Sequence, residues 1–404
     1  MNQLPCIDIW VARLLMVSFF LPMHVQVFVA IACCLYFVGR TWLQRIVHPA
    51  RYYFIAALFG GFLLLYLGAA LFTPAEYIPA LLHQCENRLA LLLIPMVFAI
   101  MSPQYTDVVR GQLRYFIYAC VLSCIIGNAG FAYDHMHNPA QPLSHVFYRL
   151  SFESYTGVHP TYMSVYLCLG IYVLMLEPGI PAWQRTVLGY LSVVLLLALL
   201  AKSPILALGI IVLHFLYRRL AALRQYGVHV AAVLGVVAAA YLFIPFVRQR
   251  VAELVSPKAQ QQTVVDNSMN MRKLIWDVDT RLLHHYWLTG AGPGRLKHLL
   301  DEQYFVYSLS HGIYPGYYDP HNEYFAEWLA LGLVGIALLL VILTVHFATA
   351  IRRKDSLYLY TMLTLAITFA TETMLARQRG IMFFAVFTAM FFYGHYSRSK
   401  ETLQ

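Results

Sequence analysis

The amino-acid sequence predicts an all-α membrane protein that crosses the bilayer many times. First, 60% of its 404 residues are hydrophobic and only 12% are charged, whereas a soluble domain carries about 25% charged residues. Second, the apolar residues gather in runs long enough to cross a bilayer, which takes about 20 residues per helix. Third, Lys and Arg collect in alternate connecting segments. This composition excludes a soluble enzyme, a nucleic-acid-binding protein and a disordered protein.

The length rule predicts about twelve transmembrane helices. Pro22 is expected to turn the first helical hairpin, and Pro204 to start the helix after Lys202, because proline is tolerated in the first turn of a helix and not in its interior. The expected spans are 7–21, 23–39, 53–72, 88–101, 113–131, 159–177, 186–201, 203–217, 228–246, 322–350, 356–375 and 380–396.

The chain is expected to divide into three parts. Residues 1–246 hold transmembrane helices one to nine, residues 247–320 form one large polar external loop, and residues 321–404 hold helices ten to twelve and a cytoplasmic tail. Within the loop, residues 269–287 show helical periodicity, with Leu274, Ile275, Val278, Leu282 and Leu283 on one side. The Gly-Ala-Gly-Pro-Gly run at 290–294 predicts a sharp turn, so the loop itself contains helices.

The net charge of +9 arises from 28 Lys and Arg against 19 Asp and Glu. In a membrane protein much of this excess marks topology, since cytoplasmic loops collect Lys and Arg. With the N-terminus inside, half of the positive residues fall in the short cytoplasmic loops and the tail. The short external loops then hold only Arg88, Arg149, Lys202, Arg377 and Arg379. The asymmetry predicts that both termini are cytoplasmic.

A small set of external cations is the first candidate site. Lys202 lies between two apolar runs, Arg272 lies in the predicted loop helix, and Arg377 and Arg379 lie at the external end of the last two spans. A cation at the hydrocarbon boundary is costly unless it snorkels or finds a partner. These side chains therefore either snorkel to the interface or bind an anion such as a diphosphate, whose oxygens several charges can share.

His321 is the candidate proton acceptor. Pro320 can open a helix, which is expected to put His321 and Asn322 in the first turn of the tenth span, at the outer membrane face. A neutral imidazole there can accept a proton near pH 7, and the alternative is a polar interfacial cap. Glu323 and Glu327 are four residues apart and share a helix face, where they either orient the histidine or meet lipid headgroups.

His159 opens the sixth span in a similar way, before Pro160. Either its amphipathic ring simply lies at the interface, or it faces the external cavity. A metal site is not expected, because the seven cysteines include no Cys-x-x-Cys pair and the 16 histidines form no close ligand set. The 290–294 segment is not a dinucleotide fingerprint either, since no strand or βαβ unit accompanies it.

The sequence resembles the O-antigen ligase and polymerase superfamily of bacterial envelopes. The first piece is the motif His321, Asn322, Glu323 and Tyr324 after Pro320, which leads into an apolar helix with glycines at 327–335. The second runs from Asn267-Ser268 through Arg272 and Trp276 to the glycine turn at 290–294. A weaker third piece is 202–208, where the family often has an arginine and this chain has Lys202, which keeps the charge and loses the bidentate fork.

The resemblance implies a multi-pass protein of the bacterial inner membrane whose active face is periplasmic, so that the 247–320 segment is a periplasmic loop. It implies an inverting, metal-independent glycosyltransferase without a cofactor, whose donor is a glycan on undecaprenyl diphosphate. An O-antigen ligase, the favoured reading, transfers the glycan to a lipid A-core sugar. A polymerase transfers it to another lipid-linked glycan, and a protein O-glycosylating relative to a serine or threonine. The expected partners are these substrates and membrane lipids, and no nucleic acid.

In this reading His321 is the general base for the acceptor hydroxyl. Arg272 and Lys202, with Arg377 or Arg379, stabilise the departing lipid diphosphate. Asn322, Glu323, Tyr324 and His159 support the site. A polysaccharide transporter or flippase is the alternative from a different class, because many helices and intramembrane charges are also typical of transport pathways.

Overall fold

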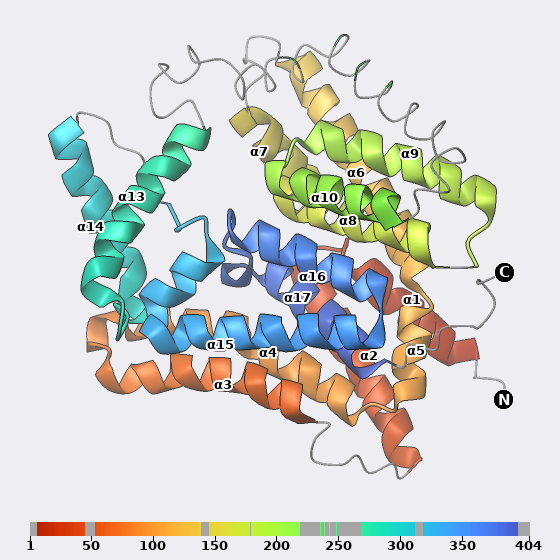
Figure 1. Cartoon of the computed structure of the whole chain (residues 1–404), viewed down its shortest axis with the longest axis horizontal. Coiled ribbons are helices and arrows are strands. Elements are labelled where there is room, and N and C mark those ends of the chain that lie inside the picture. The colour runs from red at the N-terminus through yellow and green to blue at the C-terminus, as the bar shows by residue number, and fades with distance from the viewer. Residues whose placement is uncertain are drawn as a thin grey trace.

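The computed structural model describes residues 6–44, 53–138, 145–177, 179–218, 268–311 and 318–394, with the isolated residues 235, 238, 242 and 248. The described part is helical and contains no strand (Figure 1). Its helices are α1 (Cys6–Ser18), α2 (Met23–Leu43), α3 (Phe54–Gly68), α4 (Ile78–Ile100), α5 (Pro103–Arg110), α6 (Leu113–His137), α7 (His145–Thr156), α8 (Pro160–Leu176), α9 (Ala182–Leu199), α10 (Lys202–Arg218), α13 (Ser268–Tyr286), α14 (Pro293–His311), α15 (Glu323–Arg353), α16 (Ser356–Phe369) and α17 (Gln378–Tyr393), with short 3-10 turns η2 (Ala69–Phe72), η3 (Ala75–Tyr77) and η6 (Met374–Ala376).

Several described helices are long and apolar enough to cross a membrane, so the expected all-α, multi-pass class is confirmed. Five helical segments meet this criterion: Met23–Leu43, Phe54–Phe72, Pro103–His137, Ala182–Leu199 and Glu323–Arg353. A sixth span is formed if Phe147–Thr156 and Pro160–Leu176, which are bent by 64° at their junction, count as one. The predicted number of twelve stays a prediction. Apart from four isolated residues, the expected span 228–246 and the first part of the loop lie outside the described residues, as does the tail after 394.

The fourth span differs from its prediction. Helix α4 begins at Ile78 rather than at 88, so Arg88 lies inside the helix and is buried, not in an external loop. Its guanidinium Nη2 lies 2.8 Å from Glu327 Oε1 of α15 and over the ring of Tyr66 at 4.0 Å. Tyr66 also donates a hydrogen bond to Glu327 at 2.8 Å. A buried charge is tolerated when it is paired and hydrogen-bonded in this way.

The loops assigned to the cytoplasm meet at one end of the molecule. Arg110 at the end of α5 donates hydrogen bonds to Asp355 at 2.6 Å and to Glu177 at 2.9 Å. Arg40 pairs with Asp8 at 3.3 Å. Figure 1 shows α5 at the right and the α13–α14 pair at the left of the view, so the polar helices of the predicted loop lie at the opposite end.

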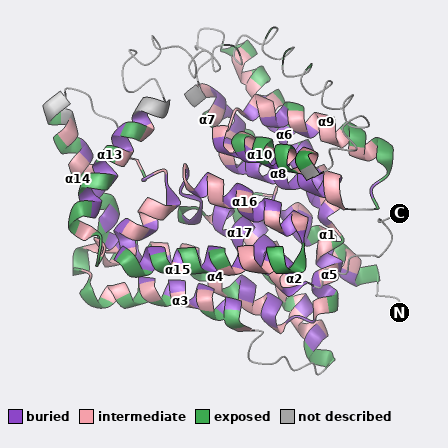
Figure 2. Ribbon diagram, in the orientation of Figure 1, coloured by how far each residue is buried: buried purple, intermediate pink, exposed green. Residues whose placement is uncertain are grey.

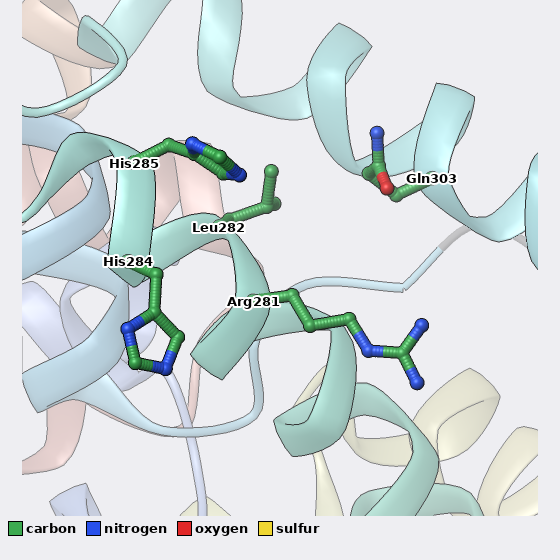
Figure 3. A pocket seen from close by; sticks show the side chains of 5 residues that line it. All are labelled: Arg281, Leu282, His284, His285 and Gln303. Atoms are coloured by element: carbon green, nitrogen blue, oxygen red, sulfur yellow. The ribbon is translucent and has the colours of Figure 1, made fainter.

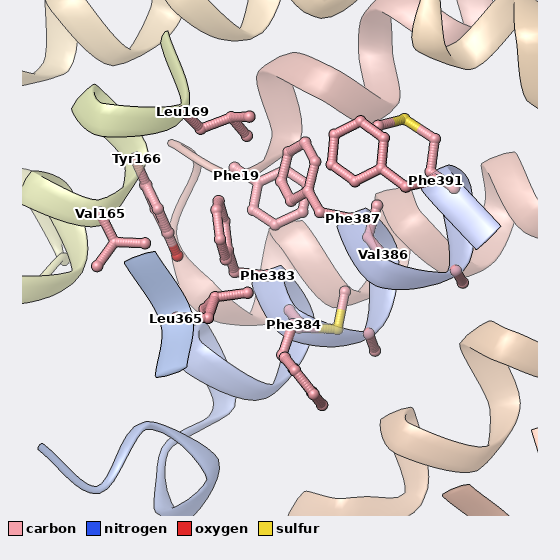
Figure 4. Packing of buried hydrophobic residues seen from close by; sticks show 14 of the residues in the cluster. Phe19, Val165, Tyr166, Leu169, Leu365, Phe383, Phe384, Val386, Phe387 and Phe391 are labelled. Atoms are coloured by element: carbon pink, nitrogen blue, oxygen red, sulfur yellow. The ribbon is translucent and has the colours of Figure 1, made fainter. Parts of the chain in front are cut away.

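The core between these ends is rich in aromatic rings (Figure 4). Tyr166 of α8 stacks on Phe383 of α17 with centroids 4.7 Å apart, and Phe19 lies 5.3 Å from Phe387. Figure 2 shows buried residues along α17 and exposed ones on the outer faces of α3 and α9. Because α17 is buried over most of its length, its packing fixes the start of the helix, which follows Arg377.

The predicted loop helix is confirmed as α13, and its expected apolar residues are buried. The glycine turn after it docks into a kink of α15, where Gly290 and Gly332 have φ of 74° and 66°. A Cβ at Gly332 would lie 2.2 Å from the carbonyl oxygen of Leu288, so this close approach requires glycine. Leu333 N donates to the same carbonyl at 3.1 Å. The turn thereby fixes α13 relative to the start of α15, where His321 lies.

Candidate functional site

His321 lies just before α15 rather than in its first turn, which corrects the expectation from the sequence. The helix begins at Glu323, and Asn322 is its N-cap, accepting a hydrogen bond from Phe325 N at 3.2 Å. The helix therefore starts two residues after His321, whose φ of 47° lies in the left-handed region. Such a conformation is uncommon and strained for a residue other than glycine, and strained residues cluster at functional sites.

Glu372 is the nearest acidic partner of His321. The Nδ1 atom of His321 lies 3.6 Å from Glu372 Oε1, with the two side chains 23% and 5% exposed. Burial alone would raise the pKa of Glu372, but the neighbouring His321, His159 and Arg272 lower it to about 2. The carboxylate is therefore ionised at neutral pH. It lies against the imidazole Nδ1, an arrangement that orients a histidine.

The other predicted external residues gather around the same carboxylate. Arg272 of α13 and His159 interact electrostatically with Glu372. Arg377, at the start of α17, also interacts with Glu372. Four candidates that lie far apart in the sequence, His159, Arg272, His321 and Arg377, thus converge on one acidic residue.

His159 also has a local structural role. It is the N-cap of α8, where its Nδ1 accepts a hydrogen bond from Thr161 N at 3.3 Å. Its ring lies 5.7 Å from that of Tyr162. The cap fixes the imidazole at the bend between α7 and α8, within electrostatic reach of His321 and Arg377.

Lys202 is the first residue of α10 and is half-buried. The neighbouring Ser203 hydroxyl is hydrogen-bonded to the hydroxyl of Thr371, the residue before Glu372. The start of α10 therefore lies against the segment that carries Glu372. This contact supports Lys202 as a member of the external cationic set.

The glutamates of the motif hold helices together instead of orienting the imidazole or meeting headgroups. Glu323 is fully buried and accepts a hydrogen bond from Leu375 N at 2.7 Å. Glu327 is fully buried against Arg88. Tyr324 donates to the carbonyl of Ala366 at 2.9 Å. Glu323 and Tyr324 thus tie the start of α15 to both sides of the Glu372 segment.

Arg379 has a structural environment that removes it from the diphosphate-binding set. Its guanidinium donates hydrogen bonds to the carbonyls of Phe19 at 2.6 Å and Leu21 at 2.7 Å, and to Gln26 Oε1 at 2.9 Å. The side chain is 5% exposed. These hydrogen bonds pair the guanidinium with the turn between α1 and α2, so Arg379 anchors that turn against α17.

Glu372 is the residue that the sequence reasoning missed. It stands between two apolar helices in Thr371-Glu372-Thr373, at the same end of these helices as Arg377. An acid at the hydrocarbon boundary needs a partner as much as a cation does. An acidic residue between two apolar runs is therefore the sequence signal that points to Glu372.

A second buried acid lies two turns along α13 from Arg272. Asp279 is fully buried, and burial raises its pKa from 3.8 to about 8. It interacts electrostatically with Tyr304 of α14, which is also fully buried. Seven residues make about two helical turns, so Asp279 and Arg272 share one face of α13.

Replacing this acid is expected to change how stability depends on pH. The folded protein keeps a proton on Asp279 that the unfolded chain releases above about pH 4. The stability that this bound proton contributes is fully present below that pH and is lost as pH rises toward 8. By pH 7 the loss is on the order of 4 kcal/mol. Asp279→Asn is therefore expected to raise the thermal midpoint at pH 8 and flatten its decline from pH 5. Asp277→Asn, which changes an exposed neighbour, is expected to change neither the thermal midpoint at pH 8 nor its decline from pH 5. Equal pH profiles of the thermal midpoint for both variants would contradict the assignment of the bound proton to Asp279.

The comparison with known families bears on this arrangement. Residues 187–340 match the family model described as O-antigen ligase, a stretch that contains Lys202, Arg272 and His321. No curated protein matches the chain. The family match agrees with the resemblance carried by the sequence motifs, and residues 187–340 of this chain are similar to that family.

Proposed function

We propose that the chain is an O-antigen ligase of the bacterial inner membrane that transfers a glycan from undecaprenyl diphosphate to a lipid A-core sugar on the periplasmic face. One observation carries the proposal: His321 is paired with the ionised, buried Glu372 while Arg272 and Arg377 gather around the same carboxylate. A base and a set of cations are the two components that transfer from a lipid diphosphate needs. The family match supports the glycosyl-transferring class.

The base is assigned to His321. The acceptor hydroxyl oxygen forms a bond to the anomeric carbon of the donor sugar as its proton passes to the imidazole Nε2. Glu372 faces Nδ1 and stabilises the imidazolium that results, as in other carboxylate–histidine pairs. Attack from the face opposite the leaving group inverts the anomeric configuration. The proton leaves the imidazole for solvent after the product departs.

The cations are assigned to the leaving group. As the bond between the anomeric carbon and the phosphate oxygen breaks, its electron pair remains on the lipid diphosphate. Arg272 and Arg377 offer charge-assisted hydrogen bonds to this growing charge, with Lys202 as a third cation. The donor already carries an activated bond, so a nucleotide is not needed for the transfer.

Arg272→Ala is expected to lower transfer by about 100-fold, because one preorganised donor to the developing charge is lost. Arg272→Lys keeps the charge without the planar fork, so its rate of transfer is expected to lie between those of the wild type and Arg272→Ala. The matched control is Lys273→Ala, which removes the next, exposed cation of the same helix. Transfer of a lipid-diphosphate glycan by purified protein measures the effect. Equal losses for Arg272→Ala and Lys273→Ala would remove the diphosphate assignment.

A polymerase of the same superfamily is the nearest alternative, because the family match is compatible with both activities. The banding pattern of a deletion strain separates them. Long glycan chains that are made but remain unattached indicate loss of a ligase, whereas attachment of single repeats indicates loss of a polymerase. The proposal predicts the first pattern.

A further inference from the structure

A pocket lies between α13 and α14, apart from the His321 cluster. Its volume is about 360 Å³, and it is lined by Arg281, Leu282, His284 and His285 of α13 and by Gln303 of α14. Figure 3 shows the His285 ring and the Gln303 amide on either side of Leu282, with Arg281 extending from the same helix. Arg281 follows Arg272 by nine residues, which is two and a half turns and about 14 Å along the axis. The pocket therefore opens on the opposite face of α13 from Arg272.

The lining is rich in hydrogen-bond donors and contains no carboxylate. Among the described residues, no hydrogen bond or ion pair is found for the side chains of Arg281, His284, His285 and Gln303. The acid next to Gln303, Glu302, is paired instead with His298 at 3.3 Å. A guanidinium, two imidazoles and an amide that line one pocket without an acidic side chain favour an anion with several oxygens.

Apolar side chains beside the pocket point to the source of that anion. Trp287 and Leu288, just after the pocket residues of α13, are 50% and 54% exposed. On α14, Phe305 and Val306 follow Gln303 and are 58% and 56% exposed. Exposed aromatic and aliphatic residues next to basic ones are typical of segments that lie at the membrane interface. Such surroundings favour an anion that is carried on a lipid.

We propose that the Arg281–His284–His285–Gln303 pocket binds the phosphate group of a lipid in the outer leaflet. In the proposed ligase reaction this lipid is the phosphorylated acceptor glycolipid. Only that last identification rests on the proposed function, since binding is a property of the pocket alone. Holding the acceptor by its phosphate leaves its sugars free to extend around α13 toward His321.

Native mass spectrometry of the purified, full-length protein tests the pocket with two probes, bisphosphorylated lipid A and phosphatidylglycerol. Arg281→Ala combined with His285→Ala is expected to weaken binding of a phosphorylated lipid by at least about tenfold, since two donors to phosphate are lost. Lys273→Ala on the same helix is the matched control and is expected to bind as the wild type does. Lipid A from which both phosphates have been removed is expected to bind wild type and double variant equally.

The two probes separate the sources of the phosphate. Loss of lipid A binding alone supports an acceptor site, and loss of both lipids supports a general headgroup site. Unchanged binding of both lipids to the double variant overturns the proposal. Because binding is measured without turnover, a protein that transfers no glycan still answers this question, and the failure of the ligase function is visible separately in the transfer assay.

Discussion

His321→Ala is expected to lower glycan transfer by about 10²–10⁴-fold, the range that a positioned general base contributes. The expectation follows from the geometry around the imidazole. Its Nδ1 faces the buried, ionised Glu372, and its backbone is held in the left-handed region just before α15. Because the imidazole is partly exposed, its other nitrogen, Nε2, is available to an acceptor hydroxyl. Purified protein, donor and acceptor, assayed for the transferred glycan, measures the loss.

His298→Ala is the matched control for this variant. His298 also faces a carboxylate, Glu302 at 3.3 Å, but both side chains are more than half exposed, so the variant is expected to keep full transfer. Glu372→Gln tests how the base is oriented. Because Glu372 acts through the imidazole, His321→Ala combined with Glu372→Gln is expected to be no slower than His321→Ala alone. Full transfer by His321→Ala would remove the mechanism.

Breaking the Arg88–Glu327 pair is expected to destabilise the fold by about 3–5 kcal/mol, because the remaining charge is buried without its partner. Arg88 lies within α4 and Glu327 within α15, with side chains 5% and 0% exposed. Arg88→Met and Glu327→Leu, each made alone, are expected to lower the thermal midpoint and the yield of folded protein in detergent.

The double variant, Arg88→Met with Glu327→Leu, is expected to recover most of this stability, since an apolar pair of similar size replaces the ion pair. Recovery is incomplete because the Tyr66 hydroxyl loses the carboxylate that accepts its hydrogen bond. Adding Tyr66→Phe is expected to restore the remainder. Single variants as stable as the wild type would show that the pair does not hold α4 against α15.

The helices could be predicted from the sequence because apolar length and charge are local properties. Every expected span within the described residues overlaps a helix. The predicted start of the fourth span was wrong for a physical reason. Arg88 looks like the end of a span, and only its pairing with Glu327, 239 positions away, allows the charge to remain inside the helix. Pairings between distant segments leave no trace in local composition.

The same distinction divides the site. His321, Arg272, His159 and Arg377 were found because each is a charge or base at an external boundary, and the structure gathers them. Arg379 was assigned to the diphosphate on the same grounds. Its hydrogen bonds to two backbone carbonyls of the α1–α2 turn depend on a chain reversal about 360 residues away, which no local pattern reports.

Reconstituted transfer distinguishes a glycosyltransferase from a transporter. Purified wild-type protein in sealed vesicles is supplied with a glycan on undecaprenyl diphosphate and with lipid A-core acceptor on the same face. We expect a glycan–acceptor product with inverted anomeric configuration and one free undecaprenyl diphosphate for each bond formed. Movement of the lipid-linked glycan across the vesicle membrane without formation of that bond would contradict it and identify a transporter.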